Sequence, residues 1–403
     1  MKQLFGSLIF FITAFLIVSC QQQTQPSDAL PKNQLMDIQI SNDDYVKMLE
    51  NKFQNLEFPI NIEFDGAHYS GTIRPSGASS RIKSRWSYRI ELNAGQSING
   101  LQVFNLSAQI SDSTMLATDV ASYFYRQADF ASFEHSHIFL RINGKDDGLK
   151  KMIEKVDEAF FDRRQLSVSE LYKSGSRISF SFEQGDPNSL PQLSFDKDIP
   201  KDDNFNSVDQ LYYALDSGVI RDAKNSIEQH LDIKQYLKYH AITSFINNKD
   251  AFENNFFLWK STPTTPFKMI PWDFDWAFDR RTEDELYGSN AIIRIMLKDR
   301  EMFEFYKLEL ENLVNNLDLQ NDVFALMDEK SAEIKAAFNL DPFLNEVYDL
   351  DEQSTKLKNF LTQRKAFFID ELDDFYFDDD DDEDDDHDEH DEHGDDEHDD
   401  DDD

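Results

Sequence analysis

Apolar and polar residues alternate with a period of two along the N-terminal third of this chain. The segment 57–74 shows this alternation on both sides of Asp65-Gly66, a pair that favours a tight β-hairpin turn. The alternation returns in three further segments, at 86–93, 136–142 and 149–156. The last two are separated by Asn143-Gly144, another hairpin-type turn. The pattern predicts an antiparallel sheet over this third of the chain.

Helical spacing, with apolar residues three and four positions apart, governs most of the remaining chain. It appears first at 114–127 and then dominates 207–248 and 301–377, with a break near Asp341-Pro342. The segment 180–205 is polar and contains prolines, so we expect a surface insertion there. The predicted fold class is α+β, with an N-terminal antiparallel sheet followed by a largely helical C-terminal part.

The first twenty residues have the pattern of a targeting segment rather than of a folded element. Lys2 precedes the apolar stretch 8–18, which is too short to be a good membrane span. The stretch closes with Ile17-Val18-Ser19-Cys20, which resembles a bacterial lipobox. We therefore expect a lipoprotein signal peptide at 1–19 and lipid attachment at Cys20. The alternative is an ordinary signal peptide with an incidental cysteine.

Lipid attachment would hold the protein at the cell envelope, on the extracytoplasmic side, with the membrane as a partner. The polar stretch 20–34 is then expected to be a flexible tether, and 35–377 the folded domain. Cys20 is the only cysteine, so no disulfide can form within the chain.

Charge is concentrated at the C-terminus. The formal net charge is −39, and 21 of the acidic residues lie in 378–403 beside four His and one Gly, which leaves −18 for the rest. Nucleic-acid binding is disfavoured, because phosphate backbones require a basic face. We expect the tail to be disordered. It is either a solvated, repulsive extension or a weak binder of divalent cations or of a basic partner.

The segment 250–275 carries the candidate chemistry. Asp250 and Asn255 precede an apolar strand, and after a Ser-, Thr- and Pro-rich turn a second strand leads to Asp273 and Asp275. Protein kinases place a catalytic base, a metal-binding Asn and a metal-binding Asp in this order. Asp250 is the candidate base, and the other three offer the hard oxygen ligands that Mg²⁺ prefers. The alternative is that these acids only cap turns.

Residues 250–278 resemble the signature of the CotH kinase family, the spore-coat protein kinases and their bacterial relatives. That family shows an Asp before an Asn-Tyr-Tyr-Leu-Tyr-like strand, followed by Pro-Trp-Asp-x-Asp, and this chain has Asn255-Phe-Phe-Leu-Trp and Pro271-Trp-Asp-Phe-Asp275. Upstream, three segments are similar to its Arg-Gly-x-Ser-Ser loop, its Lys-Ser-Tyr strand and its Asn-Gly…Glu-x-Val-Asp unit, at 73–80, 87–92 and 141–157. The resemblance spans about 60–370, and Pro-Trp-Asp-x-Asp is its most specific part.

The resemblance implies an atypical protein-kinase-like fold that binds ATP with Mg²⁺, or with Mn²⁺ in its place, and phosphorylates protein hydroxyls. It assigns the base to Asp250 and metal ligation to Asn255 and Asp273, and it places Gly77 and Ser79 near the phosphates. A cation must also neutralise the phosphates. The candidates, among which the sequence does not choose, are Arg74, Arg81, Lys83, Arg85 and Arg89. Glu154 would either pair with that cation or form an ordinary salt bridge.

Three positions depart from the family pattern. Pro75 follows Arg74 where the family often has Gly, Arg85-Trp86 replaces Lys-Lys, and Phe252 replaces a His. The first two touch nucleotide binding, so the competing hypothesis is a non-catalytic surface scaffold or adhesion module on the same fold. The metal-binding residues are intact, which favours the enzyme. The sequence does not indicate the acceptor protein.

Overall fold

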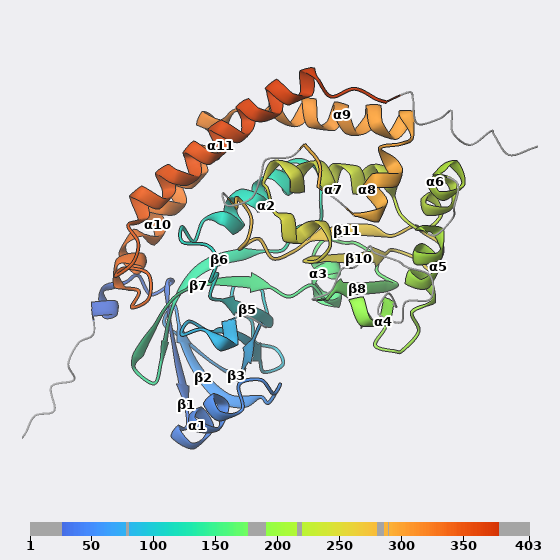
Figure 1. The fold of residues 1–403 in the computed structure, drawn as a ribbon. Coiled ribbons are helices and arrows are strands. Elements are labelled where there is room, and N and C mark those ends of the chain that lie inside the picture. The colour runs from blue at the N-terminus through green and yellow to red at the C-terminus, as the bar shows by residue number, and fades with distance from the viewer. Residues whose placement is uncertain are drawn as a thin grey trace, which may run out of the picture.

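Seven strands between residues 35 and 154 form a closed β-barrel. The computed structural model describes residues 26–77, 80–175, 191–215, 220–279, 286–288 and 290–378. Within them, one sheet closes in the order β1-β2-β3-β4-β5-β7-β6. Its strands are β1 (Leu35–Ile40), β2 (Phe58–Phe64), β3 (Ala67–Ser76), β4 (Ser87–Leu92), β5 (Val103–Ser107), β6 (His135–Ile142) and β7 (Lys145–Glu154). Neighbours are antiparallel except β1 and β6, whose parallel pairing closes the barrel (Figure 1).

Apolar residues at alternate positions of the strands fill the barrel interior. Along β2, the residues at every second position from Phe58 to Phe64 are buried and those between them are exposed. Asp65 and Gly66 both have positive φ, which is the backbone that a type I′ hairpin turn requires. The predicted hairpin is therefore confirmed. Closure into a barrel was not visible in the pattern, because alternation does not report which strands become neighbours.

A second, four-stranded sheet lies between the barrel and the main helical layer. Its order is β11-β10-β8-β9, with β8 (Glu170–Ser174), β9 (Phe195–Ile199), β10 (Phe256–Lys260) and β11 (Lys268–Pro271). All its neighbouring strands are antiparallel. β10 and β11 form the hairpin predicted between Asn255 and Asp273.

Helices form the rest of the described chain. They are α1 (Asn42–Glu50), α2 (Ala117–Gln127), α3 (Glu158–Arg163), α4 (Pro191–Ser194), α5 (Asn206–Leu215), α6 (Ile220–Glu228), α7 (Ile233–Phe245), α8 (Ala291–Met296), α9 (Arg300–Asn315), α10 (Ala325–Leu340) and α11 (Leu350–Asp373). Short turns of helix are η1 (Pro26–Ala29), η2 (Ser80–Ile82), η4 (Lys249–Phe252) and η5 (Leu319–Phe324). None of the helices in the described ranges is both long and apolar enough to cross a bilayer.

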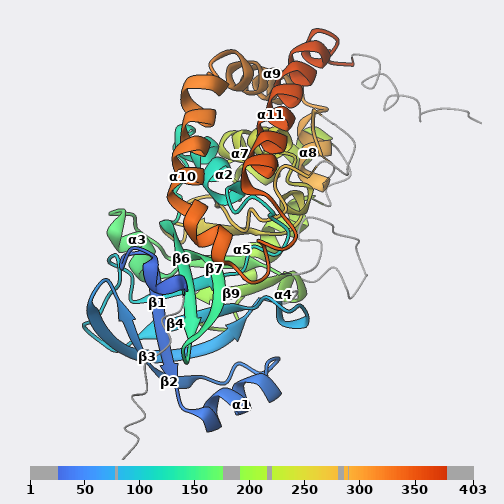
Figure 2. The same cartoon turned by 90° about the vertical axis from the view of Figure 1, so that its left-hand side faces the viewer.

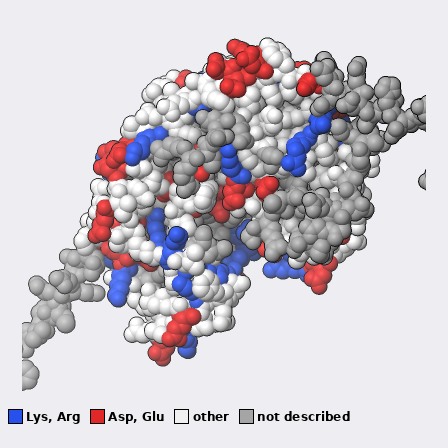
Figure 3. Space-filling view, in the orientation of Figure 1, with Lys and Arg blue, Asp and Glu red and all other residues white. Residues whose placement is uncertain are grey.

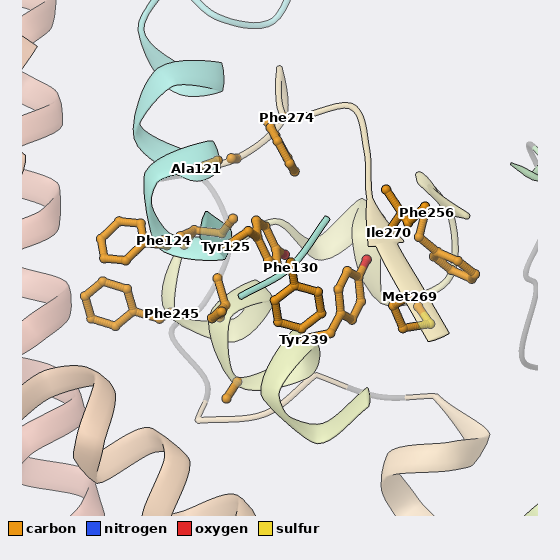
Figure 4. Close-up of a cluster of buried hydrophobic side chains, with 14 of the residues drawn as sticks. Ala121, Phe124, Tyr125, Phe130, Tyr239, Phe245, Phe256, Met269, Ile270 and Phe274 are labelled. Carbon is orange, nitrogen blue, oxygen red and sulfur yellow. The ribbon is translucent and has the colours of Figure 1, made fainter. Parts of the chain in front are cut away.

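Aromatic packing joins these helices to the second sheet. α7 contacts β11 on one side and α9 and α11 on the other. Figure 4 shows Tyr125 of α2 and Tyr239 of α7 among the buried rings, with centroids 5.7 Å apart. Phe274, from the loop after β11, stacks on Tyr125 at 5.5 Å. The loop that carries Asp273 and Asp275 is thus fixed to the core through Phe274.

One buried tie connects the helical part to the barrel. Seen from the side, α10 descends from the helical layer to the barrel (Figure 2), where it contacts β7. Asp341, which follows α10 and is 1% exposed, accepts a hydrogen bond of 2.6 Å from the Leu149 backbone N–H and lies 3.5 Å from the Arg85 guanidinium. Gly148 has φ +85°, and a Cβ there would lie 2.4 Å from the Asp341 carboxylate. Only glycine fits this contact.

Two expectations about irregular segments are corrected. The tether was expected to be flexible to 34, but from Pro26 onward it packs on the barrel. Ser27 is buried and donates 2.7 Å to Asp146, and Asp28 pairs with Arg141 at 2.5 Å. Polar composition concealed this, because the partners are polar residues of distant strands. In the expected insertion 180–205, β9 completes the second sheet, while 176–190 lies outside the described residues.

The predicted C-terminal helices are confirmed with an additional break. Besides the interruption at Asp341, α9 ends at Asn315, and Asp318 caps the next turn by accepting from the Asn321 backbone N–H. The first strand, β1, begins at the predicted Leu35, but the helical turn η1 (Pro26–Ala29) precedes it. The tail 379–403 and the segment 1–25 lie outside the described residues.

Candidate functional site

A cavity of about 530 Å³ lies between the barrel and the four-stranded sheet. Among the residues that line it are eight of the predicted site residues: Arg74, Gly77, Arg81, Arg89, Asp250, Asn255, Asp273 and Asp275. Acidic and basic side chains meet near the middle of this face of the molecule (Figure 3). Residues almost 200 positions apart in the sequence therefore face one enclosed space.

The barrel wall of this cavity includes a row of four aligned residues. Arg74 pairs with Arg89 across β3 and β4, Arg89 pairs with Asn105 of β5, and Asn105 pairs with Ile153 of β7. All four line the cavity. Because Tyr88 and Ile90 point into the barrel, Arg89 between them must point outward. The barrel therefore presents two guanidinium groups, an amide and an apolar side chain in register.

A third guanidinium stands beside this row. Arg81, in η2, also lines the cavity, and Arg74 and Arg81 both donate to the Asn55 side-chain oxygen, at 3.1 and 3.3 Å. Burial lowers the pKa of Arg74, and the neighbouring charges of Arg89 and Arg81 lower it further, against Glu57. Positive charge on this wall is therefore only partly neutralised by the described protein groups.

The loop between β3 and η2 approaches the same wall. Gly77 has φ +78°, and a Cβ there would lie 2.7 Å from the Ser80 hydroxyl. Ser80 in turn donates 2.8 Å to the Ser76 carbonyl, which links the start of η2 to the end of β3. Glycine is required here for both reasons. Ser79 lies outside the described residues, so its predicted place near the phosphates stays a prediction.

The hairpin brings the acidic wall together. The Trp272 backbone N–H donates to the Asn255 carbonyl at 3.1 Å, so the residues before β10 and after β11 are neighbours. Asn255 and Asp273 have φ of +57° and +58°, the left-handed conformation that Asn and Asp tolerate better than most residues. Such backbone is concentrated at functional sites, where the surrounding structure maintains it.

Asp250 and Asn255 are joined directly. The Asn255 amide nitrogen donates 2.5 Å to one Asp250 carboxylate oxygen, and Asn254 donates 3.4 Å to the other. Because the nitrogen of Asn255 is used in this way, its amide oxygen is the atom left for another ligand. Asp250 itself is exposed at the start of η4.

Asp273 and Asp275 repel one another inside the cavity wall. Burial raises the pKa of Asp273, the charge of Asp250 raises it further, and Lys173 lowers it. Burial also raises the pKa of Asp275 well above its usual value, with Asp273 as the next cause. Two carboxylates in the wall of a cavity that the Asn255 amide also lines form a donor set of the chemistry that suits a hard divalent cation. Over the described ranges, no three His, Cys, Asp or Glu side chains form a ready-made metal cluster.

Comparison with known proteins identifies the family. The sequence profile described as CotH kinase protein matches residues 73–368. This chain belongs to that family. It is 22% identical over 314 residues to the inner spore coat protein H of Bacillus subtilis (strain 168), covering 73% of this chain and 85% of that protein.

Solved structures similar to this CotH kinase family member include the HipA toxin of Shewanella oneidensis MR-1, in complex with HipB and operator DNA. HipA is 10% identical, with a TM-score of 0.36, covering 86% of this chain and 74% of that chain. A Golgi casein kinase with Mn/ADP bound is 10% identical with a TM-score of 0.32, covering 83% and 72%. The Helicobacter pylori kinase CtkA is 12% identical with a TM-score of 0.28, covering 79% and 91%.

Two predicted residues do not reach the cavity of this CotH kinase family member. Lys83 is exposed, and its backbone carbonyl accepts 2.8 Å from the Trp86 indole. Glu154 is fully buried and pairs with Arg163 and Arg164, and it accepts 2.7 Å from the Glu134 backbone N–H. Glu154 is therefore a structural ion-pair partner rather than a partner of the cavity cations. The candidate Arg85 is likewise buried against Leu149 and Asp341.

Sequence reasoning missed several residues that line the cavity. Lys173 lies on β8, beside Phe257 of β10, and its ammonium stands 5.8 Å from the Trp272 ring centroid. Lys155 follows β7, and Asp196 and Asp198 extend from β9. Motifs could have flagged Lys155, next to the family-like Glu154, and Lys173, which ends the family-like segment Leu171-Tyr-Lys173. Asp196 and Asp198 become visible through strand pairing alone.

Proposed function

We propose that this chain is a Mg-ATP-dependent protein kinase, held at the extracytoplasmic side of the cell envelope by a lipid on Cys20. The observation that carries the catalytic part is the cavity that faces Asp250, Asn255, Asp273 and Asp275 toward the arginines of the barrel wall. Family membership supports a kinase-like function in general terms. The nucleotide, the metal and the acceptor hydroxyl are our proposal.

The residues present fit a divalent cation. Asn255, Asp273 and Asp275 would hold it, because they offer one neutral and two anionic hard oxygens on one loop system. Such an ion, when bound, supplies positive charge to phosphate oxygens. Mn²⁺ satisfies the same oxygen donors and is included in the proposal.

Arg89 is the residue that we assign to phosphate binding. It lines the cavity and stands between Arg74 and Asn105 in the row, and its side chain has no hydrogen bond or ion pair to a described residue. Its planar guanidinium can donate two parallel hydrogen bonds to phosphate oxygens. Arg74 and Arg81, which both donate to the Asn55 side-chain oxygen, add further positive charge to this wall.

Asp250 would accept the proton of the attacking hydroxyl. Its carboxylate is exposed to the cavity and is oriented by the amide of Asn255. The Asn255 side chain would thus orient Asp250 through its amide nitrogen and bind the metal through its amide oxygen. This arrangement ties proton acceptance to metal position, and positioning is most of what phosphoryl transfer requires.

Nucleotide binding tests the proposal against the non-catalytic scaffold. ATP with Mg²⁺ should raise the melting temperature of the wild-type protein, whereas Asp273→Ala should show no such rise. Asp322→Ala, an exposed acid in η5 that does not line the cavity, is a matched control and should respond like wild type. An unchanged melting temperature in every protein would favour the scaffold.

Label transfer tests the chemistry. Asp250→Asn should transfer labelled phosphate to an acceptor protein at least 100-fold more slowly than wild type, because a positioned base contributes that much. Its ATP-dependent thermal shift should remain. Equal transfer by both proteins would remove Asp250 from the mechanism.

The lipid anchor is tested separately. Cys20→Ser should move the protein from the membrane fraction to the soluble fraction and abolish incorporation of a labelled fatty acid. Unchanged fractionation without lipid labelling of the wild type would contradict the anchor. The role of the acidic tail, as a binder of divalent cations or of a basic partner, stays a proposal of the same kind.

A further inference from the structure

A second cavity, of about 490 Å³, is lined by residues close in sequence to those of the first. β10 gives Phe257 to the first cavity and Trp259 to the second, and the segment before β6 gives Phe133 to the first and Ser132 to the second. Successive residues of an extended segment point in opposite directions, which explains the division between Ser132 and Phe133. Nothing in the proposed phosphoryl transfer uses the second cavity.

The floor of this second cavity is apolar, and its rim is basic. Trp259 and Phe130 are 7% exposed and Met269 is 1% exposed, so the floor is fixed by the core. Figure 4 shows Phe130 among the rings of Tyr125 and Tyr239, with Met269 nearby. The rim carries Arg126, Arg164 and Lys268 beside one lining acid, Asp129. Acids behind the rim pair with these cations: Glu134 lies 4.0 Å from Arg126, and Glu154 pairs with Arg164.

The polar groups of the rim differ in availability. Arg164 already binds Glu154 and the Ser132 carbonyl. It therefore contributes positive electrostatic potential to the cavity but few N–H groups for a ligand. Lys268 makes only a long ion pair of 3.9 Å with Asp232, and its side chain is half exposed. The Ser132 hydroxyl is buried and has no hydrogen-bond partner among the described groups. A buried hydroxyl without a partner is destabilising unless something else satisfies it.

We propose that this cavity is a ligand site for a small organic anion with a flat apolar body. The body would lie on Trp259 and Met269, and the anionic group would reach Lys268 and Arg126. Ser132 would donate its unsatisfied O–H to the ligand. A purely apolar ligand would leave the hydroxyl and the ammonium without partners, and an inorganic anion would leave the aromatic floor uncovered.

In this proposal, a ligand in the second cavity affects the loop after β11, which carries Asp273 and Asp275, through contacts of Phe133. Arg126 donates 2.9 Å to the Phe133 carbonyl, and Arg164 donates to the Ser132 carbonyl. The Phe133 ring lies 5.0 Å from Trp272 and 5.5 Å from Phe274, which flank Asp273. A ligand that fixes Arg126 and Ser132 would therefore also restrict the Phe133 ring, which packs against Trp272 and Phe274. Linkage requires the effect to be reciprocal.

The experiment uses 8-anilinonaphthalene-1-sulfonate, an aromatic sulfonate of the proposed class whose fluorescence rises on binding. Wild type should bind it saturably at one site. Lys268→Glu should weaken binding at least tenfold and Ser132→Ala about threefold, with unchanged melting temperatures. Lys145→Glu reverses an exposed lysine on the barrel hairpin, away from both cavities, and should bind like wild type.

Equal affinity of wild type and Lys268→Glu would overturn the site. With increasing ATP and Mg²⁺, the dissociation constant of the probe should change by a factor of about three to ten and then stay constant. A dissociation constant that keeps rising in proportion to ATP concentration would show direct competition in the first cavity, and it would also overturn the proposal. Because the variant comparison needs no nucleotide, failure of ATP binding would contradict the proposed function and leave this test intact.

Discussion

At the scale of single residues, the partners of a side chain decide its role. Five cations were candidates for phosphate binding by sequence, and their environments separate them. Arg85 is used in the tie to Asp341, and Lys83 is turned to solvent. Arg74, Arg81 and Arg89 all line the cavity, and of these Arg89, outward on β4, is the one whose side chain makes no hydrogen bond or ion pair to a described residue. Sequence could predict that Arg89 lies opposite the buried face of its strand, but not what it faces, because strand neighbours are set by barrel closure.

Replacing Arg89 tests this assignment. Arg89→Ala should weaken ATP binding about 10- to 100-fold, because one or two charge-assisted hydrogen bonds are lost. Glu91→Gln is the matched control, since Glu91 is exposed two positions along the same strand face and does not line the cavity. Titration by calorimetry measures both. Loss of affinity in the control alone would contradict the assignment.

At the scale of elements, the β10–β11 hairpin creates the acidic site. The sequence predicted the hairpin and the order of its acids, because both follow from local pattern. It did not predict that β8 and β9 complete the sheet and bring Lys173, Asp196 and Asp198 into the cavity. β8 pairs with β10 although more than 80 residues of chain separate the two strands. A local sequence pattern cannot indicate a pairing between such distant segments.

The left-handed backbone of Asn255 separates stability from function. Asn255→Gly should keep the free energy of unfolding within about 1 kcal/mol of wild type, because glycine adopts this backbone without strain while a hydrogen bond is lost. Asn255→Ala should be less stable than Asn255→Gly by about 1 kcal/mol. Both should lose the ATP-dependent thermal shift. Urea unfolding and thermal shift measure the two effects, and a retained shift in Asn255→Gly would exclude Asn255 as a ligand.

At the scale of the whole molecule, the tie at Asp341 joins two parts with separate cores. The barrel interior is one apolar cluster, and the sheet with its helices is another. Gly148→Ala should lower the free energy of unfolding by about 2–4 kcal/mol, because a Cβ would meet the Asp341 carboxylate and φ is positive.

The matched control for this tie lies in the same hairpin. Gly144 also has positive φ, +75°, but a Cβ there meets nothing within 4 Å. Gly144→Ala should therefore cost only about 1 kcal/mol. Equal losses in the two variants, measured by urea unfolding, would show that backbone strain alone matters and that the tie does not.

Acid should destabilise the molecule through buried histidines. Burial lowers the pKa of His240 to about 3, and burial with the charge of Lys151 lowers the pKa of His137 to about 4. Unfolded histidine titrates near 6.5. The unfolded state therefore binds more protons below that pH, so this stability is complete above about pH 6.5 and is lost as pH falls toward 4 and 3.

The loss between pH 7 and pH 5 should be on the order of 1–2 kcal/mol for each histidine. His240→Phe should reduce this fall, since His240 packs on the Phe252 ring at 4.7 Å and an aromatic ring preserves that contact. Urea unfolding at both pH values measures the difference. An unchanged fall in the variant would assign the acid sensitivity to other groups.

The closed barrel has a consequence for how this cavity can change. Its hydrophobic interior is sealed from the row Arg74, Arg89, Asn105 and Ile153 by the strands themselves. Ile153 belongs to the core that the sheet and the helices share, whereas the outward polar side chains of Arg74, Arg89 and Asn105 fill no core volume, so these three positions tolerate exchange without repacking. Relatives can therefore acquire different ligand preferences by altering these three positions, while the scaffold beneath them stays the same.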